Sequence, residues 1–236
     1  MIGAVSGLWR YPVKSMGGER CQSVLVEHRG VRGDRRFAVR DAEGRFGSGK
    51  TTRRFRRLDG LLEFTAAHLD THAEISFPDG RTMRSDDPAV HQALSSVFRT
   101  PLTLAEEAQA THFDAAPVHL LTTASMEWLR AALPNAIIGA RRFRPNLLIE
   151  TPGCEPLEGR WIGKCLRIGR DVELRIAGPT ERCGMVALAQ GADLNEDPAV
   201  LRAITQKAAL CFGVYATVAK SGMIALGDPV SLVTPG

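Results

Sequence analysis

Short apolar runs of four to eight residues, interrupted by Gly, Asp and Pro, dominate this sequence. Runs of this length, bounded by turn-forming residues, are typical of β-strands. We expect strands at residues 2–9, 22–27, 36–41, 74–77, 102–106, 146–150, 164–169, 172–177, 183–188, 213–220 and 228–233. Many short strands with few helices predict a mainly β fold, a barrel or a sandwich, and not a doubly wound parallel sheet.

Three segments carry helix signatures. Asp87-Pro88 and Asp197-Pro198 each place a capping carboxylate and a proline before a helical run. Thr123 is the expected N-cap of a third helix, which ends at Pro134. Asp79-Gly80 stands between two candidate strands and predicts a hairpin turn.

The length of 236 residues fits one large domain or two small domains in close contact. A chain of this size buries roughly 70% of its unfolded surface and needs no disulfide or metal to fold. No apolar run reaches the ~18 residues of a membrane span, and the N-terminus lacks a secretory pattern. The five cysteines are an odd number without a CxxC pair, so we predict a cytoplasmic protein with free thiols.

The positive charge is concentrated in one early segment. Residues 29–57 contain 11 Lys or Arg and 3 Asp or Glu, a local charge of +8, whereas the whole chain has +4. The remainder of the chain therefore has 4 − 8 = −4. Such a segment is either a solvated basic face or a site for an anion such as phosphate.

Within that segment, Gly44–Thr51 matches the phosphate-loop pattern G-x-x-x-x-G-K-[ST]. A working phosphate loop follows a buried parallel strand and opens a helix. Here the preceding strand is charged, it ends in a turn, and no strand–helix alternation follows. We therefore interpret the match as a basic hairpin and expect Lys50 to be dispensable both for nucleotide binding and for catalysis.

Two further features are candidate metal or thiol sites. His68 and His72 are four residues apart and could share a helix face, but the Glu of a zinc-protease motif is missing, which favours surface histidines. Cys183 follows Arg182, whose guanidinium would favour the thiolate. Strand alternation would place Cys183 on one face with Met185 and Ala187. A buried structural thiol and a metal ligand both remain open.

Six segments in register resemble one known family. They are LWRYPVKS at 8–15, HRGVRGDRRFAVRDAEG at 28–44, PVHLLTTAS at 117–125, RRFRPNLLIE at 141–150, ERCGM at 181–185 and CFGVYATVAKSGMIALGDPVSLV at 211–233. Together they resemble the MOSC family, named for the molybdenum cofactor sulfurase C-terminal domain. The resemblance implies a MOSC β-barrel at 116–236, packed against a MOSC N-terminal β-barrel region at 1–115.

The resemblance also implies a set of site residues. Cys183 is similar to the cysteine that ligates molybdenum in the branch related to the mitochondrial amidoxime-reducing component and its bacterial relatives. The residues matching family positions that bind the molybdenum cofactor, a molybdopterin, are Lys14, Ser15, Arg35, Thr122, Thr123, Ser125, Arg144, Asn146 and Arg182. For each of them a purely structural role is the alternative.

The implied function is a molybdenum-dependent reductase of N-oxygenated substrates. A non-catalytic cofactor carrier or sulfur-delivery module using Cys183 is the alternative, and a phosphate-binding NTPase is a distant third. Pyridoxal phosphate binding is a second property that the resemblance implies for the family. We expect a small-molecule substrate and an external ferredoxin- or cytochrome-type electron donor, with no nucleic acid or membrane partner. The run SGKTTRRFRRLDGLL departs from the family pattern, in which Arg53 or Arg54 could replace a family arginine, and this leaves the substrate open.

Overall fold

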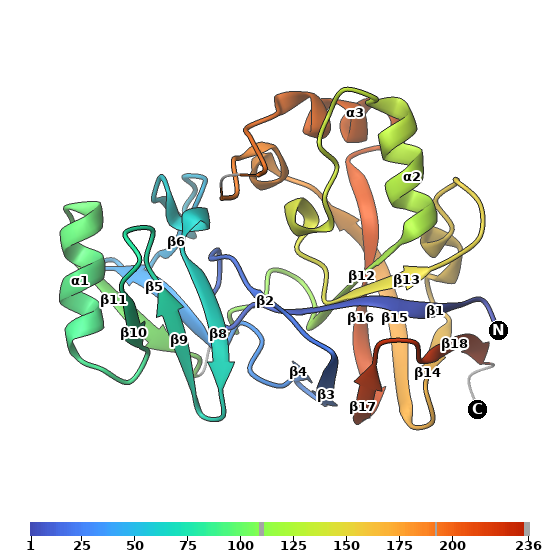
Figure 1. Cartoon of the computed structure of the whole chain (residues 1–236), viewed down its shortest axis with the longest axis horizontal. Coiled ribbons are helices and arrows are strands. Elements are labelled where there is room, and N and C mark those ends of the chain that lie inside the picture. The colour runs from blue at the N-terminus through green and yellow to red at the C-terminus, as the bar shows by residue number, and fades with distance from the viewer. Residues whose placement is uncertain (109–110, 192, 234–236) are drawn as a thin grey trace.

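Two β-rich halves lie side by side in the structure, a computed structural model that describes residues 1–108, 111–191 and 193–233 (Figure 1). Strand residues outnumber helical residues, 39% against 20%, which confirms the mainly β prediction. Most of the expected strands form close to their predicted positions. The two halves meet along the segment that follows the first strand, and this is where the candidate site lies.

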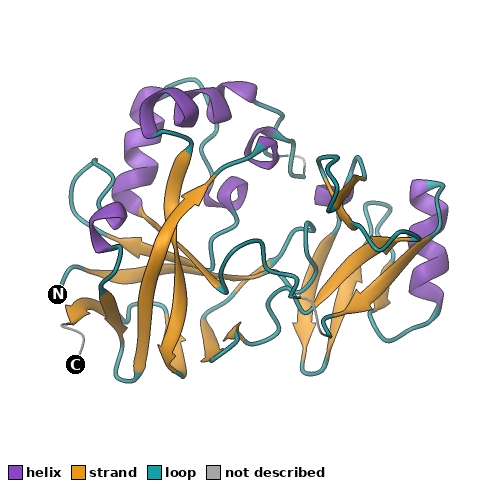
Figure 2. Cartoon of the chain, turned by 180° about the vertical axis from the view of Figure 1, so that it is seen from behind, coloured by secondary structure: helices purple, strands orange, loops and turns teal. Residues whose placement is uncertain are grey.

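The larger half is a closed seven-stranded barrel, with neighbours in the order β13-β12-β16-β15-β14-β18-β1 and closure between β1 and β13. Its strands are β1 (Gly3–Arg10), β12 (Val118–Thr122), β13 (Leu147–Glu150), β14 (Cys165–Ile168), β15 (Val172–Glu181), β16 (Cys211–Lys220) and β18 (Pro229–Val233). Apolar side chains from every strand fill the interior, among them Leu8, Leu120 and Leu174, each with no exposed surface. Helices α2 (Thr123–Ala132) and α3 (Pro198–Ala208) cover one end of the barrel (Figure 2).

The smaller half, which we call the small-sheet half, contains two short sheets and helix α1 (Ala89–Phe98). The four-stranded sheet has the order β11 (Leu102–Glu106), β5 (Phe37–Asp41), β6 (Phe46–Ser48) and β7 (Phe55–Arg57), and the three-stranded sheet has the order β10 (Thr82–Arg84), β9 (His72–Ser76) and β8 (Thr65–Leu69). Phe64, Ile75 and Leu94 form part of a separate core between the sheets and α1.

The first strands of the chain pair with strands from the C-terminal half of the sequence. Ala4 of β1 pairs with Glu150 of β13, and Gly3 pairs with Val230 of β18. A third small sheet has β3 (Ser23–Glu27) between β4 (Gly30–Val31) and β17 (Gly222–Ala225), while β2 (Glu19–Arg20) pairs with β1. The division at residues 115 and 116 stays a prediction, but N-terminal strands complete the sheets of the C-terminal half.

The helix caps follow the sequence signals with one shift. Asp197 accepts a hydrogen bond from the Ala199 backbone N–H at 2.9 Å, as expected for the cap of α3. The cap of α2 is Thr122, not Thr123, because the Thr122 Oγ1 accepts the Ser125 N–H at 3.1 Å. Each cap satisfies a backbone donor that lacks a partner within the helix.

One expected strand was wrong, and one spacing had no structural meaning. Residues 183–188 do not form a strand: Gly184–Ala187 is a 3₁₀ turn whose Val186 packs into the core beneath α2 and α3. His68 and His72 lie on β8 and β9 of a hairpin and share no helix face. Both cases are short segments in which periodicity alone does not separate helix from strand.

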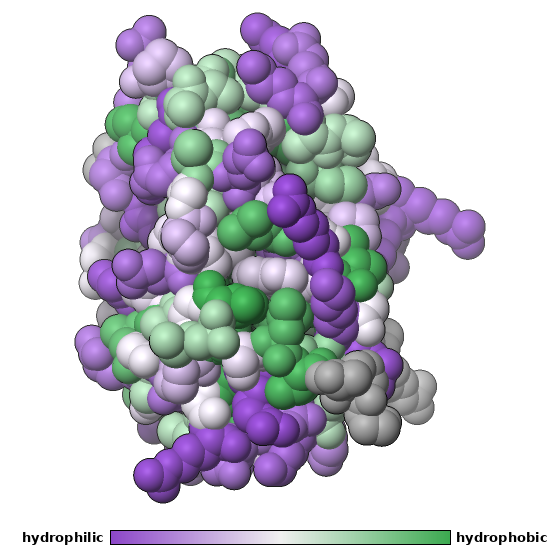
Figure 3. Space-filling model, turned by 90° about the vertical axis from the view of Figure 1, so that its right-hand side faces the viewer, coloured by the Kyte–Doolittle hydropathy of each residue, from purple (hydrophilic) through white to green (hydrophobic). Residues whose placement is uncertain are grey.

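The barrel face that carries the N-terminus has apolar surface across its centre, with hydrophilic side chains above and below (Figure 3). This face points away from the small-sheet half. Among the helices of the described residues, none has the length and apolar character that crossing a membrane requires.

Candidate functional site

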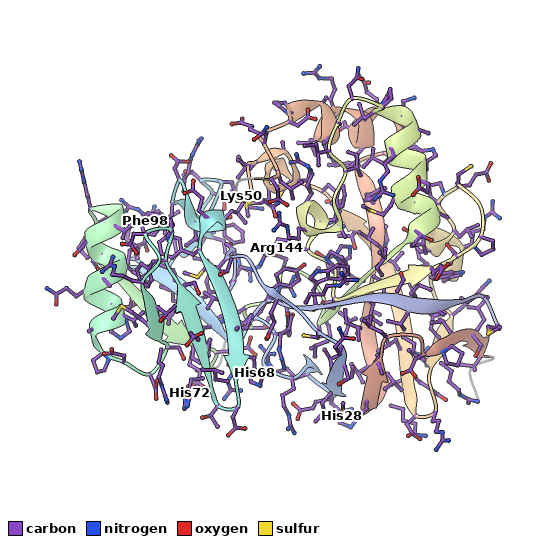
Figure 4. The ribbon with its side chains drawn as sticks, viewed as in Figure 1. His28, Lys50, His68, His72, Phe98 and Arg144 are labelled. Carbon is purple, nitrogen blue, oxygen red and sulfur yellow. The ribbon has the colours of Figure 1, made fainter. Side chains whose placement is uncertain are left out.

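A cavity of about 100 Å³ lies between the barrel and the small-sheet half, and Cys183 is on its wall. We call it the Cys183 cavity. Lys50 reaches it from the loop after β6, and Arg144 reaches it from the barrel side, so the two face the same space from opposite halves (Figure 4). Other parts of the wall come from the loop after β1, the segment before β12, the end of β15 with the turn after it, and β16.

Six of the residues predicted from the sequence line this cavity: Lys14, Ser15, Arg35, Arg144, Arg182 and Cys183. They come from four separate stretches of the chain and meet only in the folded protein. The other four predicted residues, Thr122, Thr123, Ser125 and Asn146, are not among its lining residues.

Those three hydroxyls and the amide have partners inside the protein. Thr122 and Ser125 both donate to the buried carboxylate of Glu158, at 2.8 and 2.7 Å. Thr123 donates to the Thr151 carbonyl and accepts from the Thr151 N–H. The N-terminus of α2 therefore already faces an internal carboxylate, which occupies the place that an external anion would take.

Asn146 has a similar internal role. Its Oδ1 accepts the backbone N–H of His119 at 3.1 Å, and its Nδ2 donates to the Trp9 carbonyl at 3.3 Å. The Asn146 side chain, at the start of β13, thus links β12 to β1.

The backbone of the cavity wall is strained at three predicted positions. Ser15, Arg35 and Arg144 have φ of 65°, 50° and 54°, in the left-handed region that non-glycine residues rarely adopt. Such conformations cost about 1–3 kcal/mol each and cluster at functional sites. Strain at three separate wall segments favours this cavity as the functional one.

Lys14 is almost fully buried, and its Nζ donates to Asp114 Oδ1 and to the His112 carbonyl, both at 2.7 Å. Burial lowers its pKa to about 8, although the Asp114 carboxylate acts in the opposite direction. Lys14 is therefore a cation near neutral pH with a proton that is easily removed. Asp114 is itself exposed, so this ion pair lies at the edge of the cavity.

Arg182 is fixed by the barrel. Its Nε donates to the Phe212 carbonyl at 2.8 Å, its Nη1 donates to the Phe143 carbonyl at 3.1 Å, and its Nη2 contacts His119 Nε2 at 2.6 Å. Burial lowers the pKa of Arg182 to about 10, so it stays charged at neutral pH. The guanidinium is thus directed to backbone carbonyls and a ring nitrogen, whereas the sequence suggested a direct effect on the Cys183 thiol.

The contact with Arg182 also fixes the tautomer of His119. Burial, followed by the Arg182 charge, lowers the pKa of His119 well below its usual range, so the ring is neutral. Its Nε2 must accept the Arg182 proton, so Nδ1 carries the hydrogen and donates to the Arg144 carbonyl at 3.3 Å. His119 therefore couples two arginines of the wall and acts as a scaffold.

Arg144 has one donor without a partner. Its Nη1 donates to the Met16 carbonyl, and the guanidinium carbon lies 4.3 Å from the centre of the Tyr11 ring. Its Nη2 is buried and has no hydrogen-bond partner among the described residues. Burial lowers the pKa of Arg144 to about 10, and the charge is retained at neutral pH. A buried cationic donor without an acceptor at a cavity wall is suited to an anionic ligand.

A second buried arginine, Arg142, holds the turn that follows Cys183. Its Nη1 reaches the carbonyls of Val186 and Leu188, each at 3.4 Å, and its Nη2 donates to the Asn195 carbonyl at 2.7 Å. The RRFRPN segment, which is a 3₁₀ helix at Ala140–Phe143 and not a strand, thus contributes Arg144 to the wall and Arg142 to the support behind the thiol.

The same turn contacts the small-sheet half. Met185 Sδ accepts the Gly49 N–H at 3.3 Å and lies 3.6 Å from Ser48 Oγ. A Cβ at Gly49 would lie 2.2 Å from Leu188 Cδ1, so the two halves approach closely only because residue 49 is glycine. This contact fixes the base of the loop that carries Lys50.

Sequence reasoning missed many of the lining residues. They are Ser48, Lys50, Phe55, Asp114, His119, Arg142, Phe143, Glu181, Met185, Val186 and Tyr215. Glu181 adjoins the predicted Arg182-Cys183 pair, but Tyr215 carried no signal beyond its strand pattern. The structure agrees that the segment is not a phosphate loop, since it continues into strand β7 and not into a helix. The expected hairpin is wrong, because β6 and β7 pair in parallel. Lys50 nevertheless lines the Cys183 cavity.

A larger hollow of about 730 Å³ lies elsewhere, next to the β8–β9 hairpin, and contains His68, His72 and His91. The arginines on its wall are paired: Arg32 with Glu27, and Arg36 with Glu106. No set of three His, Cys, Asp or Glu side chains within the described part of the chain is arranged to hold a metal ion. The thiol, the strained backbone and the unpaired donor make the smaller cavity the better candidate.

The family relationship rests on two matches. A model of the MOSC domain matches residues 107–231, and a model of the MOSC N-terminal beta barrel domain matches residues 2–115. No curated protein matches the chain.

Solved structures share the fold at low sequence identity. The crystal structure of the YuaD protein from Bacillus subtilis is similar with a TM-score of 0.57 at 12% identity, covering 98% of this chain and 96% of that one. A crystal structure described as a hypothetical protein has a TM-score of 0.51 at 10% identity, covering 100% of this chain and 69% of that one. YiiM from Geobacillus stearothermophilus is similar over 50% of this chain and 55% of its own, with a TM-score of 0.40 at 18% identity. Since the two family models together span nearly the whole chain and the barrel is the expected one, this chain belongs to the MOSC domain family.

Proposed function

We propose that the chain binds the molybdenum cofactor in the Cys183 cavity, with Cys183 as the protein ligand of the metal, and reduces N-oxygenated substrates there. The observation that carries the proposal is the composition of the cavity wall. One half-buried thiol stands among six Lys or Arg side chains, and only two carboxylates, Asp114 and Glu181, accompany them. A soft sulfur ligand in a cationic setting suits an anionic, sulfur-rich metal cofactor.

The donor set of this site fits such a group. The buried Arg144 Nη2 has no acceptor within the described part of the chain, and a phosphate or pterin oxygen would supply one. The cavity of about 100 Å³ is smaller than the ~300–1,000 Å³ typical of ligand sites, so the cofactor would extend through the mouth beyond this space. When bound, the cofactor supplies a metal that accepts the oxygen atom of the substrate.

The chain itself would hold charge and a proton around that chemistry. Lys14, Arg35, Arg144 and Arg182 would bind the anionic cofactor, with Arg182 and Arg144 oriented through His119. Tyr215 also lines the cavity, and burial raises the pKa of its phenol, so it stays protonated at neutral pH. A protonated phenol is a suitable donor for the oxygen that leaves as water.

Electrons would arrive from another protein, of the ferredoxin or cytochrome type. The five cysteines are free and scattered over the described structure. We therefore expect the purified chain to need a partner protein or an artificial one-electron dye for turnover. NADH-driven turnover by the chain alone would contradict this part of the proposal.

A carrier or sulfur-delivery function is the second candidate, and the partial exposure of Cys183 favours it. A half-buried thiol at a cavity can bear a persulfide or release a cofactor as well as ligate a metal. Bound molybdenum with dye-linked turnover would support the reductase, whereas bound molybdenum without turnover of any N-oxygenated compound would support the carrier.

The decisive experiment uses two cysteine variants made in a cofactor-producing host. Cys183→Ser replaces a soft thiolate by a hard, mostly protonated hydroxyl, so we expect a folded protein with little or no reduction of an N-hydroxylamine. Cys154→Ser changes an exposed cysteine and is the matched control, with metal content and rate near wild type. Wild-type metal content and rate in Cys183→Ser would refute the ligand assignment.

A further inference from the structure

The six cations of the Cys183 cavity differ in what neutralises them. Lys14 is paired with Asp114 and Arg35 with Asp34. Arg142 and Arg182 donate to backbone carbonyls and, for Arg182, to a histidine ring. Arg144 donates to the Met16 carbonyl. For Lys50, none of the described carboxylates lies within 4.0 Å of its ammonium group.

Lys50 is also held in place without an acid. Its Nζ lies 4.6 Å from the centre of the Phe55 ring, and the ring itself forms part of the cavity wall. The preceding residue, Gly49, is fixed by its hydrogen bond to Met185 Sδ. Lys50 therefore extends from a fixed point over an aromatic face, an arrangement that limits its movement while leaving its charge available.

The neighbouring arginine reinforces the positive field on this side. The guanidinium of Arg54 lies 5.5 Å from the Phe55 ring and 5.3 Å from the Phe46 ring. One of its nitrogens donates to the Phe113 carbonyl at 3.0 Å, which leaves the charge uncompensated by any carboxylate among the described ion pairs. Together with Lys14, three cations thus lie within 5.5 Å of the centre of the Phe55 ring.

We propose that Lys50 is the receptor for an anionic group, a carboxylate or a phosphate, carried by the substrate whose N-oxygenated end reaches Cys183. The proposal rests on the proposed function and specifies its substrate class. The barrel side already offers Arg144 and Arg182 to the cofactor, so the free charge on the opposite wall is left for a second anion. One ammonium group recognises negative charge but does not impose the geometry by which a backbone phosphate loop selects phosphate. We therefore expect both a carboxylate and a phosphate to bind.

The test compares reduction of 4-carboxybenzamidoxime, 4-phosphonobenzamidoxime and uncharged benzamidoxime by the molybdenum-loaded protein. We expect wild type to favour both anionic compounds. Lys50→Ala should reduce the preference, measured as the ratio of kcat/KM values for anionic and uncharged substrates, by about tenfold through KM, since one charge-assisted contact is lost. Lys50→Arg should restore the ratio, and Lys207→Ala, an exposed lysine on α3, should leave it at the wild-type value.

Two measurements separate this inference from the proposed function. The molybdenum content of Lys50→Ala tells whether the anion at Lys50 belongs to the substrate or to the cofactor. Loss of molybdenum in this variant would show that Lys50 binds the phosphate of the cofactor and would overturn the substrate assignment. Calorimetric binding of the same three compounds does not require turnover. Lys50-dependent binding of the two anionic compounds without reduction would retain the receptor and refute the reductase, whereas equal binding of all three would refute the receptor.

Discussion

The two walls of the Cys183 cavity are cationic for different structural reasons. On the barrel wall, Arg142 and Arg182 are buried and each is fixed by hydrogen bonds to backbone carbonyls from distant segments. On the small-sheet wall, Lys50 rests on the face of Phe55. Arg54 contacts the same ring from outside the lining, and neither cation has a carboxylate partner among the described residues. The barrel wall is thus built into the fold, whereas the small-sheet wall could change its charges at little cost in stability. This division suits a site that holds one ligand and selects another.

The largest effect on stability is expected from removing Arg182 from the barrel wall. Arg182→Ala leaves the buried carbonyls of Phe143 and Phe212 without a donor and removes the partner of His119. We expect the free energy of unfolding to fall by roughly 3–5 kcal/mol, because each unsatisfied buried group costs about 1–3 kcal/mol. Urea denaturation of wild type and Arg182→Ala measures this difference in the free energy of unfolding.

The control is Arg130→Ala on α2, which removes an exposed ion pair with Glu127 and a hydrogen bond to the Ile138 carbonyl. Exposed pairs contribute about 0–1 kcal/mol, so this variant should stay close to wild type. Equal losses in the two variants would show that the barrel wall is no more integral to the fold than any surface arginine.

A second variant asks whether the α2 hydroxyls belong to the fold or to the ligand. Ser125→Ala deletes the hydroxyl that donates to the buried Glu158, and we expect a loss of about 1–3 kcal/mol in unfolding free energy. Molybdenum content should remain at the wild-type level, since Ser125 does not line the cavity. The opposite pattern, wild-type stability with lost metal, would return Ser125 to the cofactor-binding set.

The ion pair of Lys14 predicts a pH dependence. Burial holds the pKa of Lys14 at about 8, against 10.5 for an ordinary lysine, so its charge is lost as the pH rises through about 8. Affinity for an anionic ligand should therefore fall by up to about tenfold between pH 7 and pH 9.5. Calorimetry with 4-carboxybenzamidoxime across this range measures it, and Lys14→Arg should flatten the profile.

The same pKa fixes the sign of the effect on stability. Between about pH 8 and pH 10.5 the unfolded chain binds the Lys14 proton and the folded chain does not, so the contribution of Lys14 to the free energy of unfolding increases with pH. Asp114, Arg35 and Arg54 also act on Lys14, and only Asp114 favours the charged form. Asp114→Asn should therefore shift the loss of anion affinity to lower pH, and an unshifted profile would contradict the ion-pair assignment.

The smallest effect on stability is expected from removing Arg54, on the small-sheet side. Arg54 is exposed, and Arg54→Ala removes hydrogen bonds to the Thr111 and Phe113 carbonyls and contacts with the rings of Phe46 and Phe55. We expect the free energy of unfolding to change by about 0.5–1 kcal/mol. A loss as large as that of Arg182→Ala, measured in the same urea series, would remove the contrast between the walls.

Much of the fold and part of the site could be predicted from the sequence. Strands such as 102–106 formed where short apolar runs lie between turn residues, because burial on a sheet face is a local requirement. The run at 183–188 failed because its apolar residues serve a 3₁₀ turn, with Val186 packed beneath α2 and α3. A six-residue window cannot show which distant surface an apolar side chain will meet.

The site residues also divide into those that the sequence could identify and those that it could not. Arg35, Arg144 and Cys183 lie in motifs whose order along the chain could be matched to a family, and they do meet at one cavity. Thr122 and Ser125 have the pattern of an anion-binding helix start, but Glu158 supplies that anion from another part of the chain. Lys50 was dismissed with its motif, since nothing near it in the sequence shows that the opposite wall of its space carries the thiol.

The way β1 closes the barrel has a consequence for how the protein is made. Its partners β13 and β18 are synthesised long after it, so a nascent chain displays β1 without either neighbour. At about 5–20 residues per second, that interval lasts on the order of ten seconds or more. During it, the small-sheet half can assemble from adjacent segments, while the barrel must wait for its final strand. Of the residues that line the cavity, Tyr215 on β16 is translated last, so Cys183 is made before its site can be complete.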